Sequence, residues 1–202
     1  MNNLKSTIET NSIKLLIWDF DGVIFDLDWN YQSTPAEFLT LLYEEINRID
    51  NSIIKDKDEF IARLFPYPEM NEVGIKHGKE VQARVKSLYE AKESAALHRA
   101  VPNQQVIDFI KGTGLPQSIW SNNLSSTIRQ LLREAGIDEK IDQIASFEKV
   151  LLSKPHIEGF KIIKDAYPEI DLKNMLLVGD SLRSDKVAAE NTGINFYYYK
   201  KQ

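Results

Sequence analysis

The feature that most constrains the fold of this chain is a short, largely apolar run near its start, Ile13–Trp18, which leads directly into Asp19, Asp21 and Gly22. The run is too short for a typical helix, and a continuous apolar run of this length is typical of a strand buried on both faces of a parallel sheet. Open α/β sheets bind their ligands at the carboxyl ends of the strands. We therefore expect this strand to carry two carboxylates to the ligand-binding edge of such a sheet.

Asp19 and Asp21 lie two residues apart, so on a regular strand they share a face, and like charges this close require a cation or a shared proton. An isolated Asp-x-Asp is more often a solvated turn. Here the apolar strand before the pair and Gly22 after it, which allows a turn and the close approach of a ligand, favour a functional site. We interpret the pair as a hard-cation site with a carboxylate nucleophile.

Alternating strand and helix patterns in the second half of the chain extend this sheet. The helix at 102–111 is expected to end in left-handed caps at Gly112 and Gly114. Strands alternating with helices predict an α/β fold with a Rossmann-like, doubly wound parallel sheet. The further predicted strands are 116–120, 141–147, 175–178 and 194–199, and the further helices are 124–135, 156–166 and a last one ending near Gly193.

The stretch at 29–98 has a helical period and no convincing strand pattern. It predicts one helix at 35–49 with Ser33 or Thr34 as N-cap, a second at 56–65 that stops at Pro66 and Pro68, and a third at 79–97. We therefore predict a core made of 1–28 and 99–202 with a small helical cap inserted at 29–98. Residues 1–12 are expected to form a polar tail or lead-in.

The composition excludes several other classes of protein. With 202 residues, of which 43% are hydrophobic and 27% charged, the chain is long enough for one substantial core and a small insertion. The absence of cysteine excludes disulfides and thiolate metal ligands and fits a reducing compartment. A net charge of −5 argues against binding to a nucleic acid polymer, and no stretch resembles a signal peptide or a membrane span. We expect a cytoplasmic protein; its oligomeric state is not encoded in these patterns.

Polar side chains follow the predicted strands at four places along the chain. Each place alone has a commoner explanation, such as a helix cap, a surface lysine or a charge in the first turn of a helix. Because parallel strands end at one edge of a sheet, the four places are expected to converge on one crevice. They are Asp19 with Asp21, Ser121 with Asn122 and Asn123, Lys154, and Asp180 with Asp185.

In this order, the four places resemble the four motifs of the haloacid dehalogenase-like (HAD) hydrolase superfamily. The helical insertion between the first two motifs resembles the cap of the branch that contains phosphoglycolate phosphatase and β-phosphoglucomutase. The spacing after Asp180 leaves Ser184 and Asp185 as alternatives for the second acidic position, and we favour Asp185 because it carries the charge. The matching segments are Asp19-Phe-Asp21-Gly-Val, Ile119-Trp-Ser121-Asn-Asn, Ser153-Lys154-Pro155, and Val178-Gly-Asp180-Ser181 through Asp185 and Ala188-Ala189.

The resemblance implies a Mg²⁺-dependent phosphatase that acts on a small phosphorylated metabolite. Asp19 would attack phosphorus to form an aspartyl-phosphate, and Asp21 would protonate the leaving alcohol and later deprotonate the attacking water. An acid two residues after the nucleophile points away from the dehalogenases of the superfamily. Carboxylates and a phosphate repel one another by about 4 kcal/mol per pair at ~4 Å and an effective dielectric of about 20, so a divalent cation is required, and oxygen ligands favour Mg²⁺.

The resemblance also distributes the remaining roles over the four motifs. Mg²⁺ would be held by the side chains of Asp19 and Asp180 and by the backbone carbonyl of Asp21. Phosphate would be bound by the Ser121 hydroxyl, by backbone N–H groups at Asn122 and at the start of the following helix, by Gly22 and by Lys154. Asp185 and Ser181 would support the site.

Two other functions fit the same motifs. A phosphomutase of the β-phosphoglucomutase type would return the phosphoryl group to a reoriented sugar, and a catalytically silent binding protein would keep the fold alone. Four converging charged groups are not needed for stability, which argues against the silent protein. His77, His98 and His156 lack metal-ligand spacing and are interpreted as structural or solvated. Substrate identity is not readable from the pattern, because specificity is expected to come from the insertion closing over the crevice.

Overall fold

The computed structural model describes residues 1–63 and 66–201. The chain divides into two compact units. The first, called here the α/β unit, comprises Met1–Asp26, Val101–Val150 and Lys154–Gln202, and the second, the helical unit, comprises Leu27–Ala100 and Leu151–Ser153. Within the described residues, no helix combines the length and the apolar character that crossing a membrane requires.

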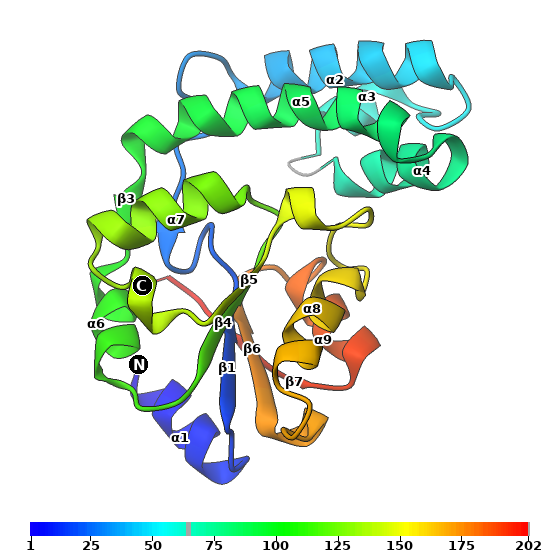
Figure 1. The fold of residues 1–202 in the computed structure, drawn as a ribbon. Coiled ribbons are helices and arrows are strands. Elements are labelled where there is room, and N and C mark those ends of the chain that lie inside the picture. The colour runs from blue at the N-terminus through cyan, green and yellow to red at the C-terminus, as the bar shows by residue number, and fades with distance from the viewer. Residues whose placement is uncertain (64–65, 202) are drawn as a thin grey trace. The chain divides into compact units, whose positions relative to one another are not determined.

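A five-stranded sheet forms the centre of the α/β unit, and all of its strand pairs are parallel (Figure 1). The strand order is β5-β4-β1-β6-β7, so the chain runs from β1 to one edge and then returns to the other side of β1. This reversal places a topological switch point between β1 and β6, and it confirms the doubly wound α/β fold. The strands are β1 (Leu15–Trp18), β4 (Gln117–Trp120), β5 (Gln143–Ala145), β6 (Met175–Gly179) and β7 (Asn195–Tyr198).

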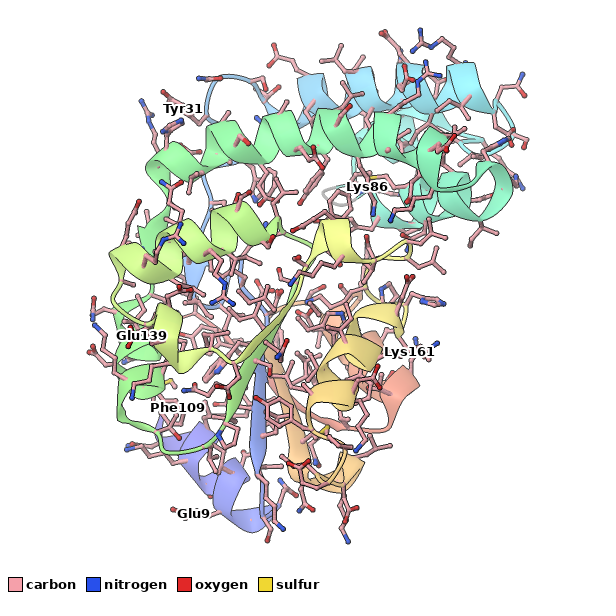
Figure 2. The ribbon with its side chains drawn as sticks, viewed as in Figure 1. Glu9, Tyr31, Lys86, Phe109, Glu139 and Lys161 are labelled. Atoms are coloured by element: carbon pink, nitrogen blue, oxygen red, sulfur yellow. The ribbon has the colours of Figure 1, made fainter. Side chains whose placement is uncertain are left out.

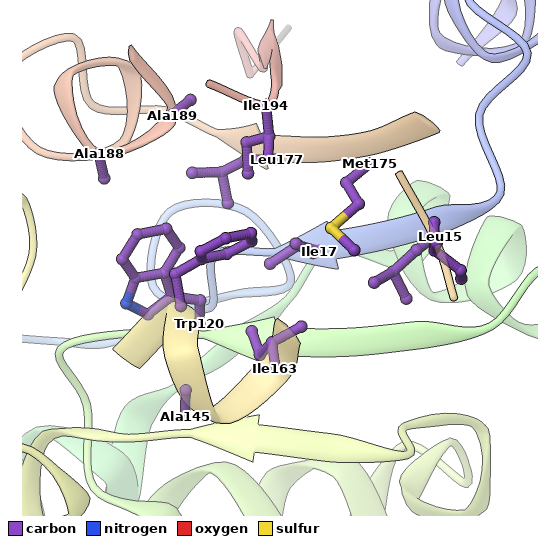
Figure 3. Close-up of a cluster of buried hydrophobic side chains, with 12 residues drawn as sticks. Leu15, Ile17, Trp120, Ala145, Ile163, Met175, Leu177, Ala188, Ala189 and Ile194 are labelled. Carbon is purple, nitrogen blue, oxygen red and sulfur yellow. The ribbon is translucent and has the colours of Figure 1, made fainter. Parts of the chain in front are cut away.

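Helices cover both faces of this sheet, with α1 (Asn2–Thr10), α6 (Gln104–Gly112) and α7 (Ser125–Glu134) on one side and α8 (Glu158–Ala166) and α9 (Asp185–Thr192) on the other (Figure 1). Leu15 and Ile17 of β1 belong to a buried cluster with residues of α8 and α9 (Figure 3). The alternate residue Trp18 packs edge-to-face on Phe109 of α6, with ring centroids 5.9 Å apart. Burial of both faces explains why β1 reads as a continuous apolar run.

Side chains fill the space between the sheet and its helices (Figure 2). One polar pair is included in this packing, since Trp18 Nε1 donates to Gln117 Oε1 at 3.0 Å and Gln117 Nε2 donates to the Ile110 carbonyl at 3.1 Å. The unit also contains a two-stranded antiparallel ribbon of β2 (Phe25–Asp26) and β3 (Val101–Pro102). Short 3₁₀ turns lie at Leu97–Arg99 in the helical unit and at Asp138–Lys140, Phe147–Lys149 and Leu172–Asn174 in the α/β unit.

The helical unit contains α2 (Pro35–Ile49), α3 (Lys57–Ile61), α4 (Tyr67–His77) and α5 (Lys79–Ala96). A capping box starts α2, because Thr34 Oγ1 accepts from the Glu37 N–H and the Glu37 carboxylate accepts from the Thr34 N–H at 2.7 Å. The core of the unit is aromatic: Tyr89 of α5 contacts the rings of Trp29, Phe38 and Tyr67.

Several local predictions differ from the structure. Residues 1–12, predicted as a polar tail or lead-in, contain the regular helix α1. Helix α3 ends at Ile61, and the predicted end of that helix at Leu64 and Phe65 lies outside the described residues. Pro66 and Pro68 do not merely end a helix, because they lie at the N-cap and in the first turn of α4, where a missing N–H costs no intrahelical bond. The left-handed caps expected at Gly112 and Gly114 are wrong, since neither glycine has a positive φ and the residue that follows α6, Thr113, is extended.

Candidate active site

The first and fourth polar clusters meet because their strands are neighbours. β1 pairs with β6 from Leu15 opposite Met175 to Trp18 opposite Val178, and the Asp19 N–H continues the ladder by donating to the Val178 carbonyl at 2.9 Å. Asp19 therefore leaves β1 beside Asp180, which leaves β6. One carboxylate oxygen each from Asp19, Asp180 and Asp185 lies within 4.8 Å of the other two. Asp19 and Asp185 are buried, whereas Asp180 is exposed.

Lys154 lies between two of these acids. Its Nζ donates to Asp19 Oδ1 at 2.8 Å and to Asp185 Oδ1 at 2.6 Å, and the lysine side chain is 2% exposed. Burial alone would lower the pKa of Lys154, but the charges of Asp185 and Asp19 outweigh it and raise the pKa above its ordinary value. The lysine is therefore a fixed positive charge, and the carboxylates still outnumber it.

The backbone of Lys154 is held by Asn122 from the loop after β4. Asn122 Oδ1 accepts from the Lys154 N–H at 2.8 Å, and Asn122 Nδ2 donates to the Lys154 carbonyl at 3.2 Å. From the sequence we predicted that Asn122 binds phosphate through its backbone, and we did not predict that its side chain holds Lys154. The sequence shows only an amide residue at the end of a strand, and the residue it binds lies 32 positions further along the chain.

Asp185 opens helix α9 and points back into the cluster. Its Oδ2 accepts from the Ser181 N–H at 3.0 Å while its Oδ1 accepts from Lys154. The backbone passes very close here, because a Cβ built on Gly179 would lie 2.5 Å from the Asp185 carboxylate. The Ser184 N–H donates to Ser181 Oγ at 3.1 Å. Of the two alternatives, Asp185 contacts Lys154, and its role as the second acid of this motif stays a prediction.

The electrostatics of the cluster favour a bound cation. Asp180 reaches solvent as a residue, but partial desolvation of its carboxylate and the charges of Asp19, Asp185 and Asp21 raise its pKa to about 7. Burial and Asp19 raise the pKa of Asp185 to about 6 against the opposing effect of Lys154. Carboxylates that resist ionisation because of one another are relieved by a divalent ion, and a donor set made of oxygen atoms fits Mg²⁺.

Asp21 lies on a tight turn that contacts Asp180. The Ile24 and Phe25 N–H groups both donate to the Phe20 carbonyl, at 2.9 and 3.1 Å, and the Gly22 N–H donates to the Phe25 carbonyl at 2.7 Å. Gly22 has φ +84°, and a Cβ there would lie 2.2 Å from Asp180 Oδ2. Glycine is required at this position both by its conformation and by the acid packed against it.

The second motif is buried and already hydrogen-bonded. The Ser121 hydroxyl donates to Asn123 Oδ1 at 2.7 Å, and the Asn123 N–H donates to Ser121 Oγ at 3.3 Å. At the start of α7 the Ser125 N–H donates to the Glu148 carboxylate at 3.1 Å. That amide is used by the protein's own acid, so the expectation that the start of this helix serves phosphate does not hold for Ser125.

The histidines make local contacts, in line with their structural interpretation. His77 Nε2 lies 3.0 Å from Asp50 Oδ2, the His98 ring lies 6.2 Å from the Tyr31 ring, and His156 Nδ1 accepts from the Glu158 N–H at 3.3 Å.

Comparison with known families identifies one match over most of the chain. The sequence model of the family described as "Haloacid dehalogenase-like hydrolase" matches residues 16–198, a span that includes all four motifs. Comparison with curated protein sequences finds no significant match.

Solved structures with the same fold include three bacterial proteins. A HAD-superfamily hydrolase, subfamily IA, from Geobacter sulfurreducens has a TM-score of 0.53 at 19% identity, covering 93% of this chain and 87% of its own. A protein from Lactobacillus plantarum whose name proposes a phosphoglycolate phosphatase has a TM-score of 0.60 at 15% identity, covering 91% and 84%. YfnB from Bacillus subtilis, described as a proposed HAD hydrolase bound to magnesium, has a TM-score of 0.56 at 19% identity, covering 92% and 86%. At these identities the likeness establishes the fold.

Proposed function

The chain belongs to the haloacid dehalogenase-like hydrolases, and on that premise we propose that it is a Mg²⁺-dependent phosphatase that cleaves a small phosphorylated metabolite through an aspartyl-phosphate. The observation that carries the proposal is the ion pair of Lys154 with Asp19 and Asp185, formed beside Asp180 at the ends of β1 and β6. A buried network of this kind is costly to desolvate and is not needed to stabilise an α/β sheet. Its presence is better explained by a site that binds a divalent cation together with a strongly anionic ligand.

Asp19 is the proposed nucleophile. One of its oxygens, Oδ1, accepts from Lys154 at 2.8 Å, which orients the carboxylate and leaves its other oxygen to attack phosphorus. The bond to the leaving oxygen breaks as the bond from Asp19 forms. Lys154 neutralises charge on the equatorial phosphoryl oxygens, which is the main demand of phosphoryl transfer.

Asp21 is the proposed general acid and base. Its turn lies directly against Asp180, so it is held close to the nucleophile that precedes it by two residues. In its protonated form it would give a proton to the leaving alcohol, and as a carboxylate it would take a proton from the water that hydrolyses the aspartyl-phosphate.

The residues that would hold Mg²⁺ are Asp19 and Asp180 through their side chains and Asp21 through its backbone carbonyl. A bound Mg²⁺ supplies positive charge that offsets the carboxylates and the phosphoryl group. Asp185 supports the site by fixing Lys154 and by accepting from the Ser181 N–H. The Ser121 hydroxyl would turn from Asn123 to a phosphoryl oxygen, aided by the Asn122 backbone N–H and by the close approach of phosphate that Gly22 allows.

The substrate is proposed to be a phosphorylated small molecule. The Lactobacillus plantarum protein that shares the fold is named for phosphoglycolate, which supports this class without selecting a member of it. We propose that the helical insertion predicted at 29–98 is the cap that determines which phosphate ester is accepted.

The test is phosphate release from a panel of phosphorylated metabolites with and without Mg²⁺, run beside Asp19→Asn. We expect Mg²⁺-dependent release that Asp19→Asn abolishes. Asp142→Asn is the matched control, because Asp142 accepts from the Tyr167 hydroxyl near the amino end of β4, away from the motifs. Unchanged release by Asp19→Asn would remove the proposed nucleophile, and a bisphosphate requirement without net release would indicate a phosphomutase.

A further inference from the structure

Asn103 is used differently from what its position predicts. It is the N-cap of α6, where an asparagine side chain ordinarily accepts a hydrogen bond from a first-turn N–H and stabilises the helix. Among the described residues its side chain caps no helix N–H. Its Nδ2 instead donates to the Val23 carbonyl at 2.9 Å and to the Tyr199 hydroxyl at 2.7 Å. A local rule broken without local gain is typical of a functional position.

The backbone of Asn103 strengthens the same connection. Its N–H donates to the Ile24 carbonyl at 2.9 Å, so one residue holds two successive carbonyls of the turn that carries Asp21. The direction of the side-chain bond is not ambiguous, because a carbonyl can only accept and the amide nitrogen must therefore face Val23.

Tyr199 connects this turn to the fourth motif. It follows β7, is 8% exposed, and its N–H donates to the Gly179 carbonyl at 2.8 Å, directly before Asp180. Its hydroxyl accepts from Asn103. Lys201, two residues after Tyr199, also forms an ion pair with Asp26, which directly follows the turn that carries Asp21. The C-terminal end of the chain thus contacts both acid-bearing loops.

These contacts connect the Asp21 turn and the Asp180 loop in a closed series. The Asp21 turn is bonded to Asn103, Asn103 to Tyr199, and Tyr199 to the residue before Asp180, while Gly22 packs against Asp180 itself. The turn cannot move relative to Asp180 without breaking a hydrogen bond or a close packing contact.

We propose that Asn103 and Tyr199 are positioning residues that hold Asp21 where it protonates the leaving alcohol, an inference that rests on the phosphatase function proposed above. If the pair positions a general acid, its loss matters most for substrates whose leaving group needs a proton. An alkyl phosphate needs that proton, whereas p-nitrophenyl phosphate releases a stable phenolate without it. A residue that merely stabilised the fold would affect both substrates equally.

Two conservative variants isolate the contacts. Asn103→Asp keeps the size of the side chain and its capacity to cap α6 but cannot donate to Val23, and Tyr199→Phe removes only the accepting hydroxyl. We expect each to lower kcat/KM for the fastest alkyl phosphate of the panel about tenfold or more, and kcat/KM for p-nitrophenyl phosphate less than about threefold. kcat/KM is the appropriate quantity because it reports the phosphoryl-transfer half of the reaction.

The chain offers matched controls for both changes. Asn195 Nδ2 also donates to two backbone carbonyls, of Lys173 and Met175, at the amino end of β6, and the Tyr167 hydroxyl donates to Asp142. Asn195→Asp and Tyr167→Phe therefore repeat the same chemical changes away from the motifs. We expect their ratio of alkyl to aryl kcat/KM to match that of the unmodified protein.

Amide hydrogen exchange supplies a readout that does not depend on activity. In Asn103→Asp and Tyr199→Phe the amides of residues 20–26 should exchange faster, including Gly22, with residues 175–178 unchanged. The proposal is overturned if the alkyl-to-aryl ratio stays within about twofold of the unmodified protein or if exchange at 20–26 does not change. If the unmodified protein hydrolyses neither phosphate, the phosphatase function fails, and unchanged exchange would then overturn the positioning inference separately.

Discussion

Gly22 and Gly78 share a φ of +84° but have different surroundings. A Cβ on Gly22 would lie 2.2 Å from Asp180 Oδ2, while one on Gly78 would have nothing within 4 Å. Alanine at either position is strained by about 1–3 kcal/mol, so both variants should lose stability. Only Gly22→Ala should also displace Asp180, and we expect it to weaken Mg²⁺ binding about tenfold or more in a calorimetric titration. Equal Mg²⁺ affinities in the two variants would show that Gly22 is required for its conformation alone.

Asp185 and Ser184 are adjacent in sequence, yet their side chains have different consequences for Lys154. Asp185 accepts from Lys154 at 2.6 Å and from the Ser181 N–H at 3.0 Å. An asparagine cannot supply the same charge to the lysine, so Asp185→Asn should lower kcat/KM about 10–100-fold. Ser184→Ala should leave kcat/KM within about twofold. A larger loss of kcat/KM in Ser184→Ala than in Asp185→Asn would show that Asp185 does not fill the second acidic position.

At the level of single elements, α2 offers a test of stability without catalysis. Thr34 and Glu37 form its capping box, and Thr34→Ala removes the hydroxyl that accepts from the Glu37 N–H. We expect the free energy of unfolding in urea to fall by about 1 kcal/mol while kcat/KM is unchanged. Thr40→Ala is the control, because Thr40 lies inside the same helix and its hydroxyl donates to the Ala36 carbonyl. An equal loss in Thr40→Ala would mean that the cap contributes nothing specific.

The elements that sequence reasoning predicted well are those whose burial leaves a periodic record. β1 and β6 are buried at every residue, and they read as apolar runs ending in acids. Helix α1 buries Leu4 alone, so its apolar periodicity was too weak to identify a helix. Helix α4 was missed because Pro66 and Pro68 are compatible both with the end of one helix and with the start of the next. Composition does not distinguish these two meanings of proline.

At the scale of the whole molecule, parallel topology accounts for how much of the site could be predicted. Acids more than 150 residues apart in sequence, Asp19 and Asp180, meet because β1 and β6 are neighbours, and the strand order at a switch point makes that neighbourhood a reasonable prediction. The contacts of side-chain amides could not be predicted in this way. The hydrogen bonds between Asn122 and Lys154 and between Asn103 and Val23 depend on which loops face each other. An asparagine in a loop looks the same in the sequence whether its side chain caps a helix or binds the backbone of a remote segment.

The charge balance of the α/β unit predicts how the stability of the metal-free protein depends on pH. Partial desolvation and neighbouring acids raise the pKa of Asp180 from its ordinary value of 3.8 to about 7, so the folded protein binds this proton more tightly than the unfolded chain does. Protonation of Asp180 therefore favours folding below the unfolded value, and this contribution is lost as pH rises through about 7.

We accordingly expect the Tm of the metal-free protein to decrease between about pH 5 and pH 8, and Mg²⁺ to raise Tm more at the higher pH, where it does not compete with the proton. Asp180→Asn should flatten the pH dependence and reduce the Mg²⁺ effect, because an amide neither repels Asp19 nor titrates. Differential scanning calorimetry of both proteins with and without Mg²⁺ measures these quantities. A Mg²⁺-induced shift in Tm that is the same at both pH values, or that persists fully in Asp180→Asn, would place the ion elsewhere and separate this acid from the cation site.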